Sequence, residues 1–296
     1  MPPPFLFLRY QTDPAAVFRY DGSTPTQIGS TFGTGIGVID NHMGKNRVIQ
    51  FQNQLYALQN LGVYKLQGDG TTWSFTGGIA FTSPSTGSTI QCRTGLFPIT
   101  INGESHLIGA YQNTSNNVRI VTMDAATNTW SDTISSITFT PDAISRGGFQ
   151  TTVVYQNKFF YTARNSGGTT SAHSYDPALD TSQTYANPFP TIAANVQDIC
   201  IHNGRLFIAY ITQAGGTGRF HLAEFNGTQW VGLGQVTPSA DSPGFLDPTQ
   251  TRLTLMSDGI NLYYIYPFTN SNRGFRVVEI SDVDSLPGTN IQGTCA

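Results

Sequence analysis

The chain has 296 residues, of which 39% are hydrophobic and only 11% are charged, and its formal net charge is −3. Soluble domains average roughly 25% charged residues, so the surface polarity must come largely from Ser, Thr, Asn and Gln. A weakly acidic chain lacks the basic surface that nucleic acids need, which excludes them as the main partner.

The ends and the cysteines exclude further classes. Met1–Leu8 has no basic region and too short an apolar run for a signal peptide. No run approaches the roughly 18 apolar residues of a membrane span, so we expect no membrane insertion. Cys92, Cys200 and Cys295 are odd in number and far apart, which argues against a zinc site or a disulfide framework. Cys200 lies in an apolar strand and is expected to be a small core residue.

The chain opens with two expected strands, 5–10 and 15–20, then a turn at Asp21-Gly22 and a short strand over 26–29. A fuller version of this pattern comes later. Residues 196–201 alternate as a half-buried strand does, and Asn203-Gly204 fits a two-residue hairpin turn. Two more strands follow, with a turn at Asn226-Gly227 and a short last strand near Trp230. The pattern predicts a four-stranded antiparallel meander.

The meander recurs with a period of about 50 residues. Its first turn is predicted at Asn53, Asn102, Asn157, Asn203 and Asp258. Its second turn is predicted at Asp21, Asp69, Asp124, Asp176, Asn226 and Asp282. Because there is one first turn fewer, the opening segment lacks the leading strand of a unit. Residues 289–295 could complete that unit, unless the sixth unit needs them.

A meander repeated at this period resembles a β-propeller, and residues 203–207 with 226–230 are similar to kelch-type and sialidase-type blades. The resemblance implies one all-β domain, residues 1–296, with six four-stranded blades and a split or incomplete terminal blade. Five or seven blades are the alternatives. The blades would span residues 1–31, 46–80, 95–139, 148–190, 195–237 and 250–292. Trp73, Trp130 and Trp230 are expected to pack between blades.

Propeller geometry places the loops between the second and third strands on the face opposite the turns. Apart from the cations Arg219 and Arg273, these loops are uncharged, and they are amide-rich and flexible, so they offer a candidate binding face. Its residues are Asn113, Asn116, Asn165, Arg219, Asn270, Asn272 and Arg273. The alternative is that they are solvated loops without a ligand.

The sequence contains few residues arranged for catalysis. The histidines have no paired spacing, and no nucleophile elbow or phosphate loop occurs. Residues 69–73 look like a shortened sialidase Asp-box, which in sialidases is a structural turn. The three glutamates, Glu104, Glu224 and Glu279, give no pair that can be placed around a glycosidic bond. Asp282 and Asp284 are a weak calcium signal. We therefore expect no enzyme, no catalytic residues, no metal and no cofactor.

The composition also looks like that of tailed-bacteriophage virion proteins. That resemblance implies a non-enzymatic structural or interaction protein of the tail, an adhesion device or a decoration layer, made in the host cytoplasm. Its partners would be other virion proteins or copies of itself, with a host surface glycan as a further partner during host attachment. The alternative is a carbohydrate-binding lectin propeller, and a glycan-processing enzyme is less favoured.

Overall fold

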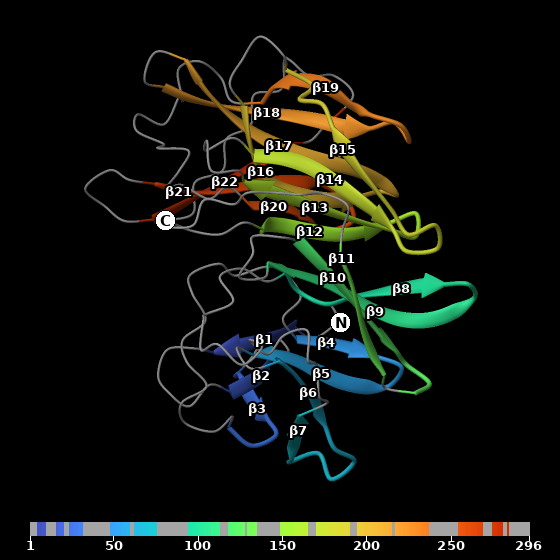
Figure 1. Ribbon diagram of the computed structural model, residues 1–296. Helices are drawn as coiled ribbons and strands as arrows, with labels where there is room; N and C mark the ends of the chain where they lie inside the picture. Colours follow the sequence, from blue (N-terminus) through green and yellow to red (C-terminus); the bar gives the residue numbers. More distant parts are fainter. Residues whose placement is uncertain are drawn as a thin grey trace. The chain divides into compact units, whose positions relative to one another are not determined.

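The computed structural model describes residues 5–9, 16–20, 24–31, 48–59, 62–75, 94–112, 118–127, 129–134, 149–164, 170–189, 194–214, 217–236, 254–268, 274–280 and 283. Every regular element among them is a β-strand (Figure 1). In this part of the chain no helix has the length and hydropathy needed to span a membrane.

The first half of the chain forms three antiparallel sheets. The three-stranded sheet is β1 (Phe5–Arg9), β2 (Ala16–Tyr20) and β3 (Thr26–Ile28). A four-stranded sheet follows, with β4 (Val48–Phe51), β5 (Gln54–Gln59), β6 (Gly62–Leu66) and β7 (Trp73–Phe75). The next consists of β8 (Phe97–Ile101), β9 (Glu104–Gln112), β10 (Val118–Asp124) and β11 (Trp130–Ile134). In each sheet the strands pair in chain order.

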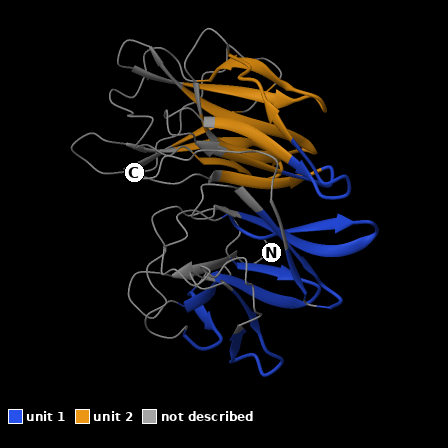
Figure 2. Ribbon diagram, in the orientation of Figure 1, with its two compact units in different colours: residues 1–149, 156–159, 175–182 blue, residues 150–155, 160–174, 183–296 orange. Residues whose placement is uncertain are grey.

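From Phe149 onward the chain forms three further antiparallel sheets. Their strands are β12 (Phe149–Tyr155), β13 (Lys158–Arg164), β14 (Thr170–Asp176) and β15 (Thr181–Tyr185); then β16 (Ala194–His202), β17 (Arg205–Ala214), β18 (Thr217–Phe225) and β19 (Trp230–Gln235); then β20 (Thr254–Ser257), β21 (Leu262–Phe268) and β22 (Gly274–Ile280). The chain divides into two compact units (Figure 2). Unit 1 contains residues 1–149, 156–159 and 175–182, and unit 2 contains 150–155, 160–174 and 183–296.

The predicted first turns are confirmed at Asn53, Asn102, Asn157 and Asn203, which have φ angles of 59°, 52°, 59° and 48°. Asn tolerates this left-handed region better than most residues do. Asp258 differs from the other four. Ser257 pairs with Leu262, so four residues lie between the paired strands, and the backbone N–H of Asp258 donates to the carbonyl of Asn261 (3.3 Å). A loop of that length does not need two left-handed residues.

The second turns share one hydrogen-bond pattern. An Asp or Asn side chain accepts the backbone N–H groups two and three residues later, which is an Asx turn. It occurs at Asp69, Asp124, Asp176 and Asn226, and again at Asp258. The predicted turns at Asp21 and Asp282 lie outside the described residues.

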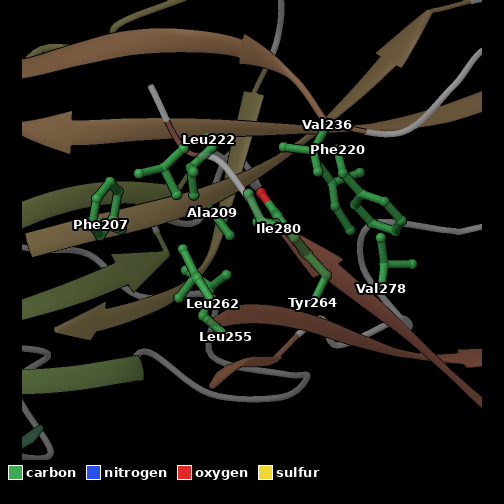
Figure 3. Close-up of a cluster of buried hydrophobic side chains, with 12 residues drawn as sticks. Phe207, Ala209, Phe220, Leu222, Val236, Leu255, Leu262, Tyr264, Val278 and Ile280 are labelled. Atoms are coloured by element: carbon green, nitrogen blue, oxygen red, sulfur yellow. The ribbon is translucent and has the colours of Figure 1, made fainter. Parts of the chain in front are cut away.

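The core of unit 2 follows from the two-residue period of β17. Its residues from Leu206 to Ile211 are all buried, and successive side chains point to opposite faces. Phe207, Ala209 and Ile211 pack with side chains of β18 and of the sheet β20-β21-β22 (Figure 3). The alternate residues pack on the other face, against β12 to β15 residues such as Phe160 and Tyr185. An apolar strand therefore serves two sheet interfaces.

The tryptophans lie between sheets, as predicted. Half-buried Trp73 packs against Val17 of β2 and Ala57 of β5, and Trp130 packs with Phe51 and Leu107. In unit 2, Trp230 is 4% exposed and its ring centroid lies 6.2 Å from that of Phe160. Each indole fills space that smaller residues would leave empty.

The structure confirms an all-β chain built from consecutive antiparallel meanders, which the β-propeller resemblance implied. The number of blades, the single domain over residues 1–296 and the blade boundaries stay predictions. The strand proposed for residues 289–295 lies outside the described residues.

Candidate functional site

Most of the predicted loop face lies outside the described residues. This holds for Asn113, Asn116, Asn165, Asn270, Asn272 and Arg273. Arg219 lies within β18, where its backbone pairs with Thr212 of β17. The loop in which we expected Arg219 is therefore shorter than predicted, because pairing continues out to Ala214 and Thr217. Thr217 and Gly218 adopt the extended conformation of β18, which the sequence pattern did not indicate.

Another group of polar side chains gathers at the opposite ends of the strands of unit 2. We call it the turn-face cluster and define it as Tyr155, His202, Asn203, Ser257, Asp258 and Tyr263. These residues end β12, β16 and β20, occupy the turns that follow, or begin β21. They belong to the first turns of three consecutive sheets, and hydrogen bonds between these turns bring the side chains together.

Hydrogen bonds connect the cluster across the sheets. The Tyr155 hydroxyl donates to the carbonyl of Gly204 (3.0 Å). His202 Nδ1 lies 2.8 Å from Ser257 Oγ, which also accepts the N–H of Gly259 (3.1 Å). On the other side of the ring, Nε2 lies 3.1 Å from Asn203 Nδ2. The buried imidazole is thus in contact with polar atoms at both nitrogens.

The outer part of the cluster is a solvated turn. The Tyr263 hydroxyl donates to Asp258 Oδ2 (2.8 Å). The N–H of Asn261, the Tyr263 hydroxyl and the N–H of Ile260 together hold the pKa of Asp258 below its ordinary value, so this carboxylate stays ionised. Met256 is 46% exposed and Ile260 is 79% exposed. The surface therefore combines hydroxyl, amide and carboxylate groups with exposed aliphatic side chains.

A second polar network lies inside unit 2, around Asp198. This residue follows a register shift in β16 and is 3% exposed. Its Oδ1 accepts from the Thr151 hydroxyl and the N–H of Ile199 (2.8 Å), and its Oδ2 accepts the N–H of Leu255 (2.7 Å). Both carboxylate oxygens are bonded, so the side chain links β12, β16 and β20. Sequence reasoning missed it, because Asp198 stands at a polar position of an alternating strand.

The other described acidic side chains mostly hold turns or pair with a cation. Glu224 accepts two hydrogen bonds from Arg205, at 2.7 and 2.6 Å. Within the described ranges, no group of three His, Cys, Asp or Glu side chains is placed to hold a metal ion. We therefore take the turn-face cluster as the candidate site, because an imidazole, a hydroxyl group and an amide lie within hydrogen-bond distance there at the surface.

No protein-family model and no curated protein matches the sequence. Solved structures do show similarity. An ulvan lyase of polysaccharide lyase family PL25 is 12% identical with a TM-score of 0.44, over 95% of this chain and 67% of the lyase. A mutant of AofleA from Arthrobotrys oligospora is 11% identical with a TM-score of 0.47, over 90% and 76%. A Trypanosoma rangeli sialidase bound to the inhibitor DANA is 14% identical with a TM-score of 0.40. This chain covers 51% of the sialidase, and 92% of this chain is matched.

These similarities correct one expectation. The prediction that the chain is not an enzyme is contradicted, because a polysaccharide lyase and a sialidase stand among the similar structures. The spacing of carboxylates along the chain indicated no catalytic pair, but a fold can assemble a site from residues that are distant in sequence. Nothing in the comparisons supports a bacteriophage virion origin.

Proposed function

We propose that the chain is a carbohydrate-binding protein that holds an uncharged glycan against the turn-face cluster. The observation that carries this proposal is the mixture of groups at the surface around Asn203, Asp258 and Tyr263. Sugars present hydroxyl groups that both donate and accept hydrogen bonds, and C–H faces that pack on apolar atoms. Amide, phenol and carboxylate groups supply the first kind of contact, and the exposed Met256 and Ile260 supply the second.

The low charge of the chain supports an uncharged ligand. With 15 basic and 18 acidic residues in 296, the chain has few charges to attract a polyanion. In unit 2, Arg205 is already engaged by Glu224. We therefore expect binding to change little with salt concentration, since screening acts on charged pairs. The proposed partner is a surface glycan. Association with further copies of the chain is a separate proposal, and sedimentation velocity would test it by measuring the oligomeric state.

A glycan array, with neutral and anionic glycans side by side, tests the proposal. The variant Asn203→Gly keeps the left-handed turn but removes the amide, and we expect it to weaken binding about threefold or more. Its matched control is Asn53→Gly, at a first turn of unit 1, which should bind as the wild type does. Failure of every glycan to bind, or equal loss in both variants, would overturn the proposal.

Glycan processing is the second candidate, and one observation favours it. Ser257 Oγ and His202 Nδ1 are 2.8 Å apart, within the reach expected of a nucleophile and its base. Such a pair serves acyl transfer, for example removal of an ester group from a sugar. The variant Ser257→Ala should then abolish turnover of an esterified glycan, while binding through Asn203, Asp258 and Tyr263 persists. Turnover that survives in this variant excludes the pair.

A further inference from the structure

Two Asn-Gly pairs occupy exposed turns and differ in one respect. Asn102-Gly103 joins β8 to β9, and Asn226-Gly227 joins β18 to β19. Both glycines have a positive φ angle, 87° and 99°, and open space surrounds the position that a Cβ would occupy at each. Neither glycine is therefore crowded by a neighbouring side chain at its Cα. The difference lies in what holds the asparagine amide.

An Asn-Gly pair can lose its amide through its own backbone. The nitrogen of the glycine attacks Cγ of the asparagine and forms a C–N bond, while the amide nitrogen leaves as ammonia. The resulting five-membered succinimide then takes up one water molecule, which opens it to aspartate or isoaspartate. Overall, an amide and water become a carboxylic acid and ammonia, and no oxidant, reductant or cofactor is needed. The step requires Cγ to rotate toward the glycine nitrogen.

The Asn226 side chain is held against that rotation. Its Oδ1 accepts the N–H of Thr228 (3.1 Å), the N–H of Gln229 (3.0 Å) and the Thr228 hydroxyl (3.0 Å). The backbone N–H of Asn226 also donates to the carbonyl of Gln229 (3.1 Å). Moving Cγ of Asn226 toward Gly227 requires the three bonds to Oδ1 to break first.

The Asn102 side chain has no such restraint. Within the described part of the chain it forms no hydrogen bond, and the turn is closed only by the pairing of Ile101 with Glu104. Both Asn102 and Gly103 are exposed. In a two-residue hairpin turn of this kind, the N–H of the second turn residue is not needed by the ladder. The nucleophile and the amide carbon are both accessible.

From this contrast we propose that Asn102 is a site of spontaneous deamidation and that the Asx turn protects Asn226. The proposal does not depend on the function proposed above, because both turns lie outside the turn-face cluster. The third described pair, Asn203-Gly204, has contacts to His202 and Tyr155. At Asn203 both the asparagine amide and the glycine carbonyl are engaged, so Asn102 and Asn226 differ more simply from one another.

Peptide mapping by mass spectrometry tests the proposal on the unmodified full-length chain. The folded protein is incubated at mildly alkaline pH, and conversion of each asparagine to aspartate and isoaspartate is followed over time. We expect conversion at Asn102 to be at least about tenfold faster than at Asn226. Equal rates, or faster conversion at Asn226, would overturn the proposal.

An unfolded control separates structure from sequence. In concentrated urea the Asx turn is lost, so the two rates should converge, because glycine follows both asparagines. If the difference between Asn102 and Asn226 persists in urea, the flanking sequence causes it and the proposal fails. The variant Thr228→Val removes one of the three bonds to Asn226 Oδ1 and should speed conversion there. An unchanged rate in this variant, with the turn intact by circular dichroism, would count against the restraint.

Discussion

Gly29 stands directly after β3, at a position where a side chain has no room. Its φ angle is +71°, and an added Cβ would collide with Nε1 of Trp73 and lie 3.0 Å from Cδ1 of Leu66. Trp73 belongs to the packing between β2 and β5. A side chain at this position would therefore be disfavoured twice, by the left-handed backbone conformation and by the close approach to the core of unit 1.

The variant Gly29→Ala should lower the free energy of unfolding by about 2 to 4 kcal/mol, because backbone strain and overpacking add. Gly70→Ala is a matched control, with a φ angle of +69° and open space around the added methyl group. It should lose only about 1 kcal/mol. Urea denaturation measures both values. Equal losses would show that Trp73 moves aside without cost.

His173 gives stability a pH dependence. Its ring stacks on Tyr161 with centroids 5.1 Å apart, and burial lowers its pKa from the ordinary 6.5 to about 4. Between pH 6.5 and about pH 4, His173 is protonated in the unfolded chain but stays neutral in the folded chain. Folding stability from this residue is therefore complete above pH 6.5 and falls as the pH decreases toward 4.

Urea denaturation across that range should show a slope of up to about 1.4 kcal/mol per pH unit, and His173→Gln should remove much of it. Asp69 serves as an internal reference. The Thr72 hydroxyl, with the N–H groups of Thr72 and Thr71, lowers the pKa of Asp69 from 3.8 to about 2. Its contribution is lost only below about pH 4. A slope unchanged by His173→Gln would refute the assignment.

At the scale of the elements, turns also connect sheets. The side-chain amide of Asn157, in the turn between β12 and β13, forms hydrogen bonds with the backbone of β8. Oδ1 accepts the N–H of Thr100 (2.9 Å), and Nδ2 donates to the carbonyl of Thr100. The Asn53 turn has the same Gln-Asn sequence and the same φ angle of 59°, but its amide forms no hydrogen bond within the described residues.

This pair allows a clean measurement. Both Asn157→Gly and Asn53→Gly keep a left-handed turn, so their backbone effects should cancel in the comparison. Asn157→Gly should be less stable than Asn53→Gly by about 1 to 2 kcal/mol, the worth of the two lost hydrogen bonds. Thermal or urea unfolding would detect the difference. Indistinguishable variants would mean that water replaces the amide at Thr100.

At the scale of the whole molecule, Asp198 links the first strands of three sheets in unit 2. Asp198→Asn keeps the shape but turns one acceptor into a donor that faces an N–H group. We expect a loss of about 2 to 3 kcal/mol. Asp69→Asn is the control and should unfold close to wild type, since Asn226 forms the same kind of Asx turn. A mild effect at Asp198 would show that the network can rearrange.

The same residues show how far the sequence could be interpreted. Turns such as Asn203-Gly204 and Asp69-Gly70 could be predicted, because their geometry depends on four adjacent residues. The role of Asp198 could not, because its partners Thr151 and Leu255 are 47 and 57 residues away. The turn-face cluster was missed for the same reason, since His202 and Ser257 are 55 residues apart. Arg219 was expected in a loop because the glycines before it are typical of loops, whereas its backbone pairs with Thr212.

The Asx turns have a consequence for protein engineering. Each is exposed at its tip. Its geometry is fixed by hydrogen bonds from the backbone N–H groups two and three residues later to one side chain, as at Asn226. A peptide epitope or a labelling site inserted just beyond such a turn would leave the underlying ladder intact, since tolerance depends on burial and hydrogen bonding. The exposed Leu179 after Asp176 marks a place where this chain could serve as a display scaffold.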